Sequence, residues 1–285
     1  LSWNSHGSSQ HKLNFAKYLV SPEVVGDKTP ILCNQENFIL KGNSYMLFQA
    51  IPNFHFFINP AVKNIQDCGR PKNGMFIGIP NSIKSHVKDV SPNHWRVQAV
   101  IISSVQSKTL LINSYFPTDK RELENNNDNE ELTETIAIIQ NVIVNNDCDS
   151  VVWAGDINAD FSRDTRHSAT VNDTIQDLNF SVLWDKFDID FTCTYEREGV
   201  TYVSLLDHFF ISQTLTENVV DAGVIHHPDN MSDHHPIYCI LDLKTEKSTT
   251  KITQTLPRPS WKQANTNDKK MYKYLLESKL SSIVI

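Results

Sequence analysis

Acidic, amide and histidine side chains stand at the ends of short apolar runs in this 285-residue chain. Glu36 follows "ILCNQ", Asp156 and Asn158 follow "VVWAG", and Asp233 and His234 precede "IYCIL". An acid just beyond a buried strand projects into the crevice at the sheet edge, where ligands often bind in α/β proteins. We therefore interpret these residues as parts of one assembled site.

The residue types in this set favour a hard cation. Carboxylate oxygens, with no cysteine and few histidines among them, select Mg²⁺ or Mn²⁺ over zinc. Such a metal polarises a phosphoryl oxygen, while a carboxylate or an imidazole handles the proton of the attacking water. Hydrolysis of a phosphate ester is the reaction that this set supports best.

Most of these residues also have a purely structural explanation. "GDIN" suits a turn in which Asp156 caps the backbone, and Glu36 suits a solvated position after a strand. "NMSDHHPI" (230–237) suits a polar turn in which Pro236 sets the entry into a strand. Asp207 resists such an explanation, because an acid between "SLL" and "HFFI" is costly to bury unless it is paired or bound to a metal. The combination indicates a catalytic site.

Short strands must position these residues. Apolar runs rich in β-branched residues predict strands at 29–33, 74–79, 97–105, 109–116, 150–156, 204–212 and 236–243. Apolar stripes predict helices at 11–20 and 130–144, and the polar stretch 122–131 predicts a solvated loop. Strands that follow one another closely indicate hairpins, and a helix followed by a strand indicates an α/β unit. Together these patterns predict mixed sheets with helices packed outside them.

Charge and hydropathy limit the possible partners. The net charge of −7 argues against binding nucleic acid through a broad basic face, but it does not exclude a metal-dependent enzyme that acts on phosphodiesters. No run approaches the roughly 18 apolar residues of a membrane span, and no signal-peptide pattern opens the chain, so we expect an intracellular protein with no membrane partner. Five scattered cysteines are expected to be small core residues rather than disulfides or zinc ligands: Cys33, Cys68, Cys148, Cys193 and Cys239.

The two ends of the sequence suggest a fragment of a longer polypeptide. "LSWN" begins as though already inside a strand, and 271–283 carries apolar residues at helical spacing without a helix stop. The two prolines of "TLPRPSW" (255–261) indicate a stiff linker. We therefore expect one domain over 1–246, followed at 247–285 by a linker and the start of another region.

Six motifs follow one another along nearly the whole chain to about residue 243: "SWNSHG" at 2–7, "QE" at 35–36, "INSYFP" at 112–117, "WAGDINAD" at 153–160, "SLLDH" at 204–208 and "SDHHP" at 232–236. In this order they resemble the endonuclease/exonuclease/phosphatase superfamily, and most closely the apurinic-type endonuclease domain of non-LTR (LINE-like) retrotransposons. Each motif alone is weak, and the six in order are strong. The resemblance implies a DNase I-like, four-layer α/β/β/α sandwich of two mixed sheets, with its active site at one end.

The resemblance also implies a role for each matched residue. Glu36 would be the main metal ligand, with Asn4 and Asp233 beside it. Asp156 and Asn158 would orient the nucleophilic water.

At the reacting phosphate, Tyr115 would contact the phosphate or the developing charge. Asp207 would pair with His234, which would bind the scissile phosphate or act as general base. Thr194 and Ser232 would also contact phosphate. His235 has no implied role.

The activity implied by the resemblance is a Mg²⁺-dependent DNA endonuclease that leaves a 3′-hydroxyl. In a LINE-like setting this nick, made in the nucleus, primes reverse transcription. "LPRPSW" followed by "DKKMYKYLLESKL" resembles the connector to a reverse transcriptase, to which the parent chain would be fused. The segments 41–73 and 159–172, the second with Arg163, Arg166 and His167, are candidate groove-reading loops.

Two alternatives remain open at this point. One is a phosphatase or phosphodiesterase of the same fold that acts on a small or lipid phosphate. The other is a non-catalytic binding module, which would predict the loss of Glu36, Asp156 or His234, whereas all three are present.

Overall fold

The computed structural model describes residues 1–63, 69–104, 107–118, 126–189 and 191–243, together with Thr266, Lys269, Lys270, Tyr272, Lys273 and Leu276. The chain divides into two compact units, Leu1–Thr249 and Thr250–Ile285. The described residues of the second unit are helical. The predicted linker at 255–261 and most of the predicted helix at 271–283 lie outside the described residues, so the domain boundary stays a prediction.

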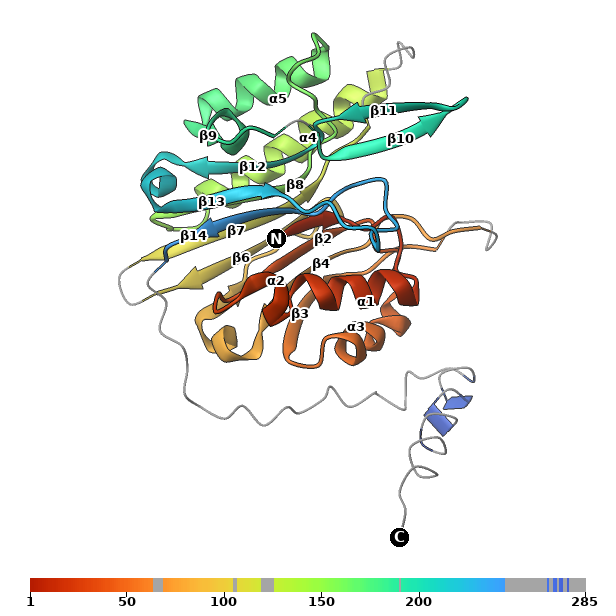
Figure 1. Ribbon diagram of the computed structural model, residues 1–285. Helices are drawn as coiled ribbons and strands as arrows, with labels where there is room; N and C mark the ends of the chain where they lie inside the picture. Colours follow the sequence, from red (N-terminus) through yellow and green to blue (C-terminus); the bar gives the residue numbers. More distant parts are fainter. Residues whose placement is uncertain are drawn as a thin grey trace. The chain divides into compact units, whose positions relative to one another are not determined.

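Two six-stranded sheets form the centre of the first unit (Figure 1). The strands of the first sheet are, in spatial order, β13 (Val219–Val224), β14 (Ile237–Leu241), β1 (Ser2–Asn4), β2 (Leu32–Gln35), β4 (Met75–Pro80) and β3 (Phe54–Asn59). Only β1 and β2 run parallel in this sheet.

The second sheet has the same number of strands and the same kind of mixed pairing. Its order is β5 (Val87–Asp89), β6 (Val97–Ser103), β7 (Lys108–Tyr115), β8 (Ser150–Asp156), β12 (Asp207–Ser212) and β9 (Phe180–Val182). Only β7 and β8 are parallel. A separate hairpin of β10 (Cys193–Arg197) and β11 (Val200–Ser204) extends from one end of the sandwich (Figure 1).

Helices cover the outer faces of both sheets (Figure 1). On the first sheet lie α1 (Gln10–Leu19), α2 (Pro22–Val25) and α3 (Tyr45–Ala50), and on the second lie α4 (Asn126–Val144) and α5 (Arg166–Asp177). Short 3-10 turns occur at Lys41–Asn43, Asn81–His86, Leu183–Asp185 and Gln213–Asn218. These layers confirm the predicted four-layer α/β/β/α sandwich.

Three apolar cores hold the layers together, and alternate residues of one strand contribute to different cores. Leu111, Val152 and Phe209 point into the core between the sheets. Their neighbours Trp153 and Phe210 point outward, against α4 and α5. Because both faces of the central strands are buried, their sequences are continuous apolar runs. A third core packs α1 and α3 onto the outer face of the first sheet.

The predicted hairpin and α/β unit are both confirmed. β6 and β7 pair antiparallel across a short turn, and α4 connects the parallel strands β7 and β8. The predicted strand at 204–212 is wrong at its start, because Ser204 ends β11 and Leu205 and Leu206 link it to β12.

The loop predicted at 122–131 needs a correction. α4 already begins at Asn126, and residues 122–125 lie outside the described residues. Glu130 and Glu131 lie near the start of the helix, where negative charge is favourable to the helix dipole. The polar residues from Asn126 to Glu131 therefore belong to the first turns of α4 and not to a loop.

The two segments predicted as groove-reading loops contain regular structure. The segment 41–73 includes α3 and β3. Residues 166–172 form the first half of α5, which Thr165 caps by accepting a hydrogen bond from Ser168 N. Here His167 is buried, and its Nε2 lies 3.2 Å from the carbonyl oxygen of Ile157. His167 is therefore a core residue and is not available to read a DNA groove.

The expected burial of the cysteines holds for only two of the four that the structure describes, since Cys148 and Cys239 are partly exposed. Cys33, Cys148, Cys193 and Cys239 are free, and Cys33 and Cys193 are buried, whereas Cys68 lies outside the described residues. Among the helices of the described ranges, none combines the length and the apolar character needed to cross a bilayer.

Candidate active site

Strand ends from both sheets meet at one end of the sandwich. Asn4 at the end of β1 pairs with Gln35 at the end of β2, and Tyr115 at the end of β7 pairs with Asp156 at the end of β8. Asp207, which starts β12, pairs with Asp156 from the other side. The polar turn at 230–237 leads into β14, which lies beside β1. Motifs that are distant in the sequence therefore meet, because the strands that carry them end at the same end of the sandwich.

Backbone conformations at this end are unusual. Glu36 and Asn158 have φ values of 49° and 52°, in the left-handed region that residues other than glycine seldom occupy. Gly155 has φ of 154°, and a Cβ atom there would lie 2.0 Å from the carbonyl oxygen of Ser114. Glycine is therefore required before Asp156, because β7 and β8 approach too closely for any side chain. Left-handed residues of this kind cluster at functional sites.

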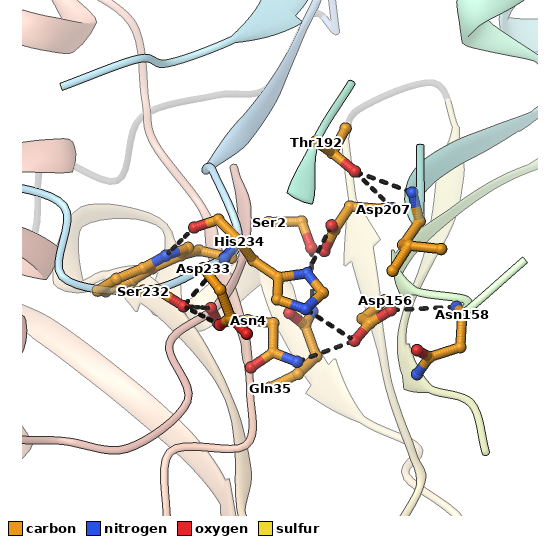
Figure 2. Close-up of polar contacts among 12 residues, drawn as sticks. Ser2, Asn4, Gln35, Asp156, Asn158, Thr192, Asp207, Ser232, Asp233 and His234 are labelled. Carbon is orange, nitrogen blue, oxygen red and sulfur yellow. Dashed lines mark hydrogen bonds and ion pairs between the residues drawn. The ribbon is translucent and has the colours of Figure 1, made fainter. Parts of the chain in front are cut away.

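His234 lies between two buried aspartates (Figure 2). Its Nδ1 lies 2.8 Å from Oδ2 of Asp207, and its Nε2 lies 3.8 Å from Oδ2 of Asp156. The second Asp207 oxygen, Oδ1, is buried and has no hydrogen-bond partner among the described residues. The three side chains thus form a compact Asp–His–Asp group in the interior of the protein.

The proton equilibria of this group are strongly shifted. Burial by itself would lower the pKa of His234, but the carboxylates of Asp207 and Asp156 raise it well above its ordinary value. Burial raises the pKa of Asp156 to about 7, and repulsion from Asp207 and Glu36 adds to the shift against the opposing effects of His234 and Asn4. Near neutral pH the imidazole is therefore positively charged, while Asp156 exchanges its proton readily.

Asn4 connects two of the predicted carboxylates. Its Nδ2 donates to Oε2 of Glu36 at 3.0 Å and to Oδ2 of Asp156 at 2.8 Å. Its Oδ1 accepts from the backbone N–H of His6 at 3.0 Å, which fixes the orientation of the amide. Asn4 therefore holds Glu36 and Asp156 side by side.

Tyr115 and Asn158 border the same carboxylates. Burial and the neighbouring charges of Glu36 and Asp156 raise the pKa of Tyr115, whose hydroxyl also bonds to Glu36. Asn158 donates from its backbone N–H to Oδ1 of Asp156 at 3.0 Å, and its side chain is bonded to the carbonyl oxygen of Phe116. The structure thus brings both residues to the site.

The turn at 230–237 attaches to β1 through Ser232. The Ser232 hydroxyl donates to the carbonyl oxygen of Asn4 at 2.7 Å, and Oδ1 of Asp233 lies 3.2 Å from Nδ1 of His6. Burial would raise the pKa of Asp233, but His234 and His6 lower it below its ordinary value. The ring of His235 packs instead against Phe191 and His226, and it forms no hydrogen bond or ion pair with the site carboxylates among the described residues.

Thr192 is a site residue that the sequence analysis did not identify. It is fully buried, and its Oγ1 accepts the backbone N–H groups of Leu206 and Asp207 at 3.0 and 2.9 Å. Thr194, which was expected to contact phosphate, lies two residues further along, and its backbone N–H donates to the Asp233 carbonyl oxygen at 2.8 Å. "FTCTY" contains both threonines, and its spacing does not distinguish them.

Beneath the site, buried amides connect the two sheets. Gln35 donates to Oδ1 of Asn113 at 2.6 Å, and Asn113 donates in turn to the backbone oxygen of Asn34 at 3.2 Å. The side chain of Asn34 donates to the carbonyl oxygen of Trp3 at 2.8 Å. This bond satisfies the buried amide of Asn34, which precedes the "QE" motif. Hydrogen-bonded amides of this kind hold neighbouring elements in one arrangement, and only Oε1 of Gln35 has no partner among the described residues of this group.

Cationic side chains stand beside the carboxylates. Arg70 lies 2.7 Å from Nε2 of His6, and Lys12 donates to the carbonyl oxygens of Ser5 and His6. Arg163, from the segment expected to read DNA, forms an ion pair with Asp160 at 3.1 Å and donates to Ser204 on β11 at 2.6 Å. Its guanidinium thus supports the β10–β11 hairpin.

The donor atoms of the site fit a divalent cation. Carboxylate oxygens of Asp156 and Asp207 lie within 4.8 Å of each other, and Glu36 joins them through Asn4, whereas the protonated imidazole of His234 balances their charge and does not itself bind the cation. The unpartnered Oδ1 of Asp207 is a further free acceptor. A set composed mostly of carboxylate oxygens suits Mg²⁺ or Mn²⁺.

Solved structures resemble this chain over most of its length. An AP endonuclease from Leishmania major matches with a TM-score of 0.64 and 16% identity, over 84% of this chain and 85% of that one. The endonuclease domain of TRAS1, a telomere-specific non-LTR retrotransposon, matches with a TM-score of 0.59 and 18% identity, over 86% and 98%. A 3′ phosphatase from Neisseria bound to product DNA hairpin matches with a TM-score of 0.62 and 16% identity, over 85% and 98%.

By sequence, no family model matches the chain, and no curated protein matches it either. The fold is nevertheless defined by the structural matches and by the two mixed sheets between helical layers. It is the DNase I-like fold of the endonuclease/exonuclease/phosphatase proteins.

Proposed function

We propose that this protein is a Mg²⁺-dependent DNA endonuclease that hydrolyses a phosphodiester and leaves a 3′-hydroxyl and a 5′-phosphate. The observation that carries the proposal is the position of His234 between Asp207 and Asp156, with Glu36 attached to Asp156 through the amide of Asn4. This arrangement combines a proton acceptor, a buried positive charge and metal-binding oxygens within one site.

Asp156 is the candidate general base. Its pKa of about 7 lies near the working pH, where a base both accepts a proton and is present in its ionised form. The backbone N–H of Asn158 and the amide of Asn4 hold its two oxygens in place. Asp156 therefore takes a proton from the attacking water.

His234 supplies positive charge beside the scissile phosphate. Asp207 keeps the imidazole protonated and fixes its orientation through Nδ1. The other nitrogen, Nε2, faces Asp156, and it is the proposed contact to the scissile phosphate. Charge fixed in this way stabilises a phosphorane-like transition state without reorganisation during the reaction.

Glu36 and Asp233 are the proposed metal-binding carboxylates, with Asn4 holding Glu36 in position. When bound, Mg²⁺ supplies Lewis acidity to the phosphoryl oxygen and charge compensation to the leaving oxygen. Tyr115, whose hydroxyl is bonded to Glu36, is the proposed contact to a phosphate oxygen. Ser232 and Thr194 complete the proposed phosphate contacts from the turn and the hairpin.

The biological setting belongs to the same proposal. The order of the six motifs supports a retrotransposon endonuclease that nicks target DNA in the nucleus to prime reverse transcription, in a parent chain fused to a reverse transcriptase. The similarity to the TRAS1 endonuclease domain agrees with this setting.

A plasmid-nicking assay tests the activity. With Mg²⁺, the purified protein is expected to convert supercoiled plasmid to the open circular form, and Glu36→Ala and His234→Ala are expected to abolish the conversion. His235→Gln is the matched control, because His235 is the neighbouring histidine and its ring faces Phe191 and His226. Nicking that survives in both alanine variants would refute the mechanism.

The chemistry of the ends separates an endonuclease from a phosphatase of the same fold. DNA ligase reseals nicks that carry a 3′-hydroxyl and a 5′-phosphate, so the products of this protein are expected to be ligatable. A protein that releases phosphate from a 3′-phosphorylated oligonucleotide but leaves plasmid supercoiled would be a phosphatase.

A further inference from the structure

Cys193 faces the candidate catalytic histidine across a short strand pairing. Cys193 and His234 form an isolated antiparallel bridge. The hydrogen bonds on either side of it run from Thr194 N to Asp233 O at 2.8 Å and from His235 N to Thr192 O at 2.7 Å. The bridge is therefore a non-hydrogen-bonded pair, the kind in which opposed side chains lie closest on one face of a ladder.

The three side chains at this bridge include a thiol, whereas the proposed Mg²⁺ ligands are carboxylates. Ligand atoms of Cys193, Asp233 and His234 lie within 4.8 Å of one another. A thiol, an imidazole and a carboxylate are a zinc-type ligand set, whereas Mg²⁺ avoids sulfur. Asp233 is partly exposed while Cys193 and His234 are buried, so a cation from solvent enters past Asp233.

We propose that Cys193, Asp233 and His234 form an inhibitory site for a thiophilic divalent cation such as Zn²⁺. The inhibitory part of this inference rests on the proposed nuclease function, because the cation removes His234 from its partners Asp207 and Asp156. The binding part does not depend on that function. The catalytic scheme does not use Cys193. Replacing this thiol should therefore weaken Zn²⁺ binding without affecting Mg²⁺ binding.

Binding exchanges protons for the cation. The Cys193 S–H bond breaks as the metal–sulfur bond forms, the imidazolium of His234 loses one proton as its nitrogen coordinates, and both protons go to solvent. The thiol gives up its proton to a metal that binds sulfur strongly, whereas Mg²⁺ does not compete for a thiol. Three protein ligands leave a fourth position for water or a phosphate oxygen.

Cobalt spectroscopy tests the binding without any measurement of activity. Co²⁺ added to the intact protein is expected to give a near-ultraviolet thiolate-to-cobalt charge-transfer band that Zn²⁺ abolishes. Cys193→Ser and Cys193→Ala are expected to lack the band, and Cys148→Ser, which removes a thiol from the turn before β8, is expected to keep it. Circular dichroism verifies that each variant is folded. A wild-type protein without the band, or a band that persists in both Cys193 variants, overturns the site.

Zinc titration of nicking at a fixed Mg²⁺ concentration tests the inhibition. Cys193→Ser is expected to nick like the wild type without zinc and to need at least about 10-fold more Zn²⁺ for half-inhibition, since one metal ligand is lost. Equal zinc sensitivity of the two proteins overturns the proposal, because the zinc would then act at the Mg²⁺ carboxylates. If no variant nicks DNA, the proposed function fails, and the cobalt spectra still decide whether the site exists.

Discussion

Nδ1 of His234 lies 2.8 Å from Oδ2 of Asp207, although 27 residues separate them in the chain. The pair forms because β12 begins where the turn before β14 ends, and the Trp184 indole and the Thr192 hydroxyl bond the Asp207 backbone at this position. Both side chains are buried, so the interaction is much less screened than a surface ion pair.

Asp207→Asn is expected to lower the nicking rate by about 10²- to 10⁴-fold, the range in which positioned acid–base groups contribute to catalysis. Without the carboxylate, the imidazole loses both its orientation and the charge that keeps it protonated. Single-turnover nicking at saturating Mg²⁺ measures the effect. Asp173→Asn, an exposed carboxylate on α5, is the control and should leave the rate unchanged. An Asp207→Asn rate within about twofold of the wild type would contradict a role for the pair.

Asp156→Asn is expected to abolish nicking and to raise the melting temperature in metal-free buffer at neutral pH. Because the folded-state pKa of Asp156 is raised to about 7, the folded protein binds more protons than the unfolded chain between about pH 4 and pH 7. Stability from this group therefore falls as pH rises through that window. Asparagine removes the buried charge, and a gain of about 1 kcal/mol would raise the melting temperature by about 2 to 4 °C. A lower melting temperature for the variant would show that its charge stabilises the fold.

The pH dependence of the rate should follow the same carboxyl group. If Asp156 accepts the proton of the attacking water, the rate rises with pH as this group loses its own proton, with a midpoint at or below about 7, because a bound cation lowers the pKa of a neighbouring carboxyl. Single-turnover rates from about pH 5.5 to about pH 8.5 at saturating Mg²⁺ measure the profile. A rate independent of pH across this range would exclude Asp156 as the general base.

Gly155→Ala is expected to destabilise the protein by at least about 2 kcal/mol, because the new methyl group meets the Ser114 carbonyl oxygen and the backbone has a positive φ. Thermal or denaturant unfolding measures the loss. Gly42→Ala is the matched control, since a Cβ atom at Gly42 has no atom within 4 Å and its φ is ordinary. Equal stability of the two variants would mean that β7 and β8 separate at little cost.

Part of the site could be predicted from the sequence, because each apolar run and each motif is a local pattern of residues. The run "SVVWAGD" predicts β8 with Asp156 at its end, and "SLLDHFF" already requires a partner for Asp207. The prediction failed where local signals conflict. Helix α5 has polar residues along most of its length and is held by Val171 and Ile175 in the core, so 166–172 looked like a loop. Thr192 and Thr194 share one motif, and only the packing of the hairpin against β12 separates them.

The sequence by itself determined that the chain forms mixed sheets with acids at the strand ends, because strand periodicity and residue chemistry are encoded within a few neighbouring positions, whereas the sandwich of two sheets came from the resemblance of the six motifs. Only the tertiary structure decided which side chains form hydrogen bonds with one another and which could bind the same cation. The bond from His234 to Asp207, the amide of Asn4 between two carboxylates, the raised pKa of Asp156 and the thiol of Cys193 opposite His234 all depend on contacts between distant strands. The strength of these interactions depends on how deeply the side chains are buried and how far apart they lie, and both are fixed only when the sheets pack together.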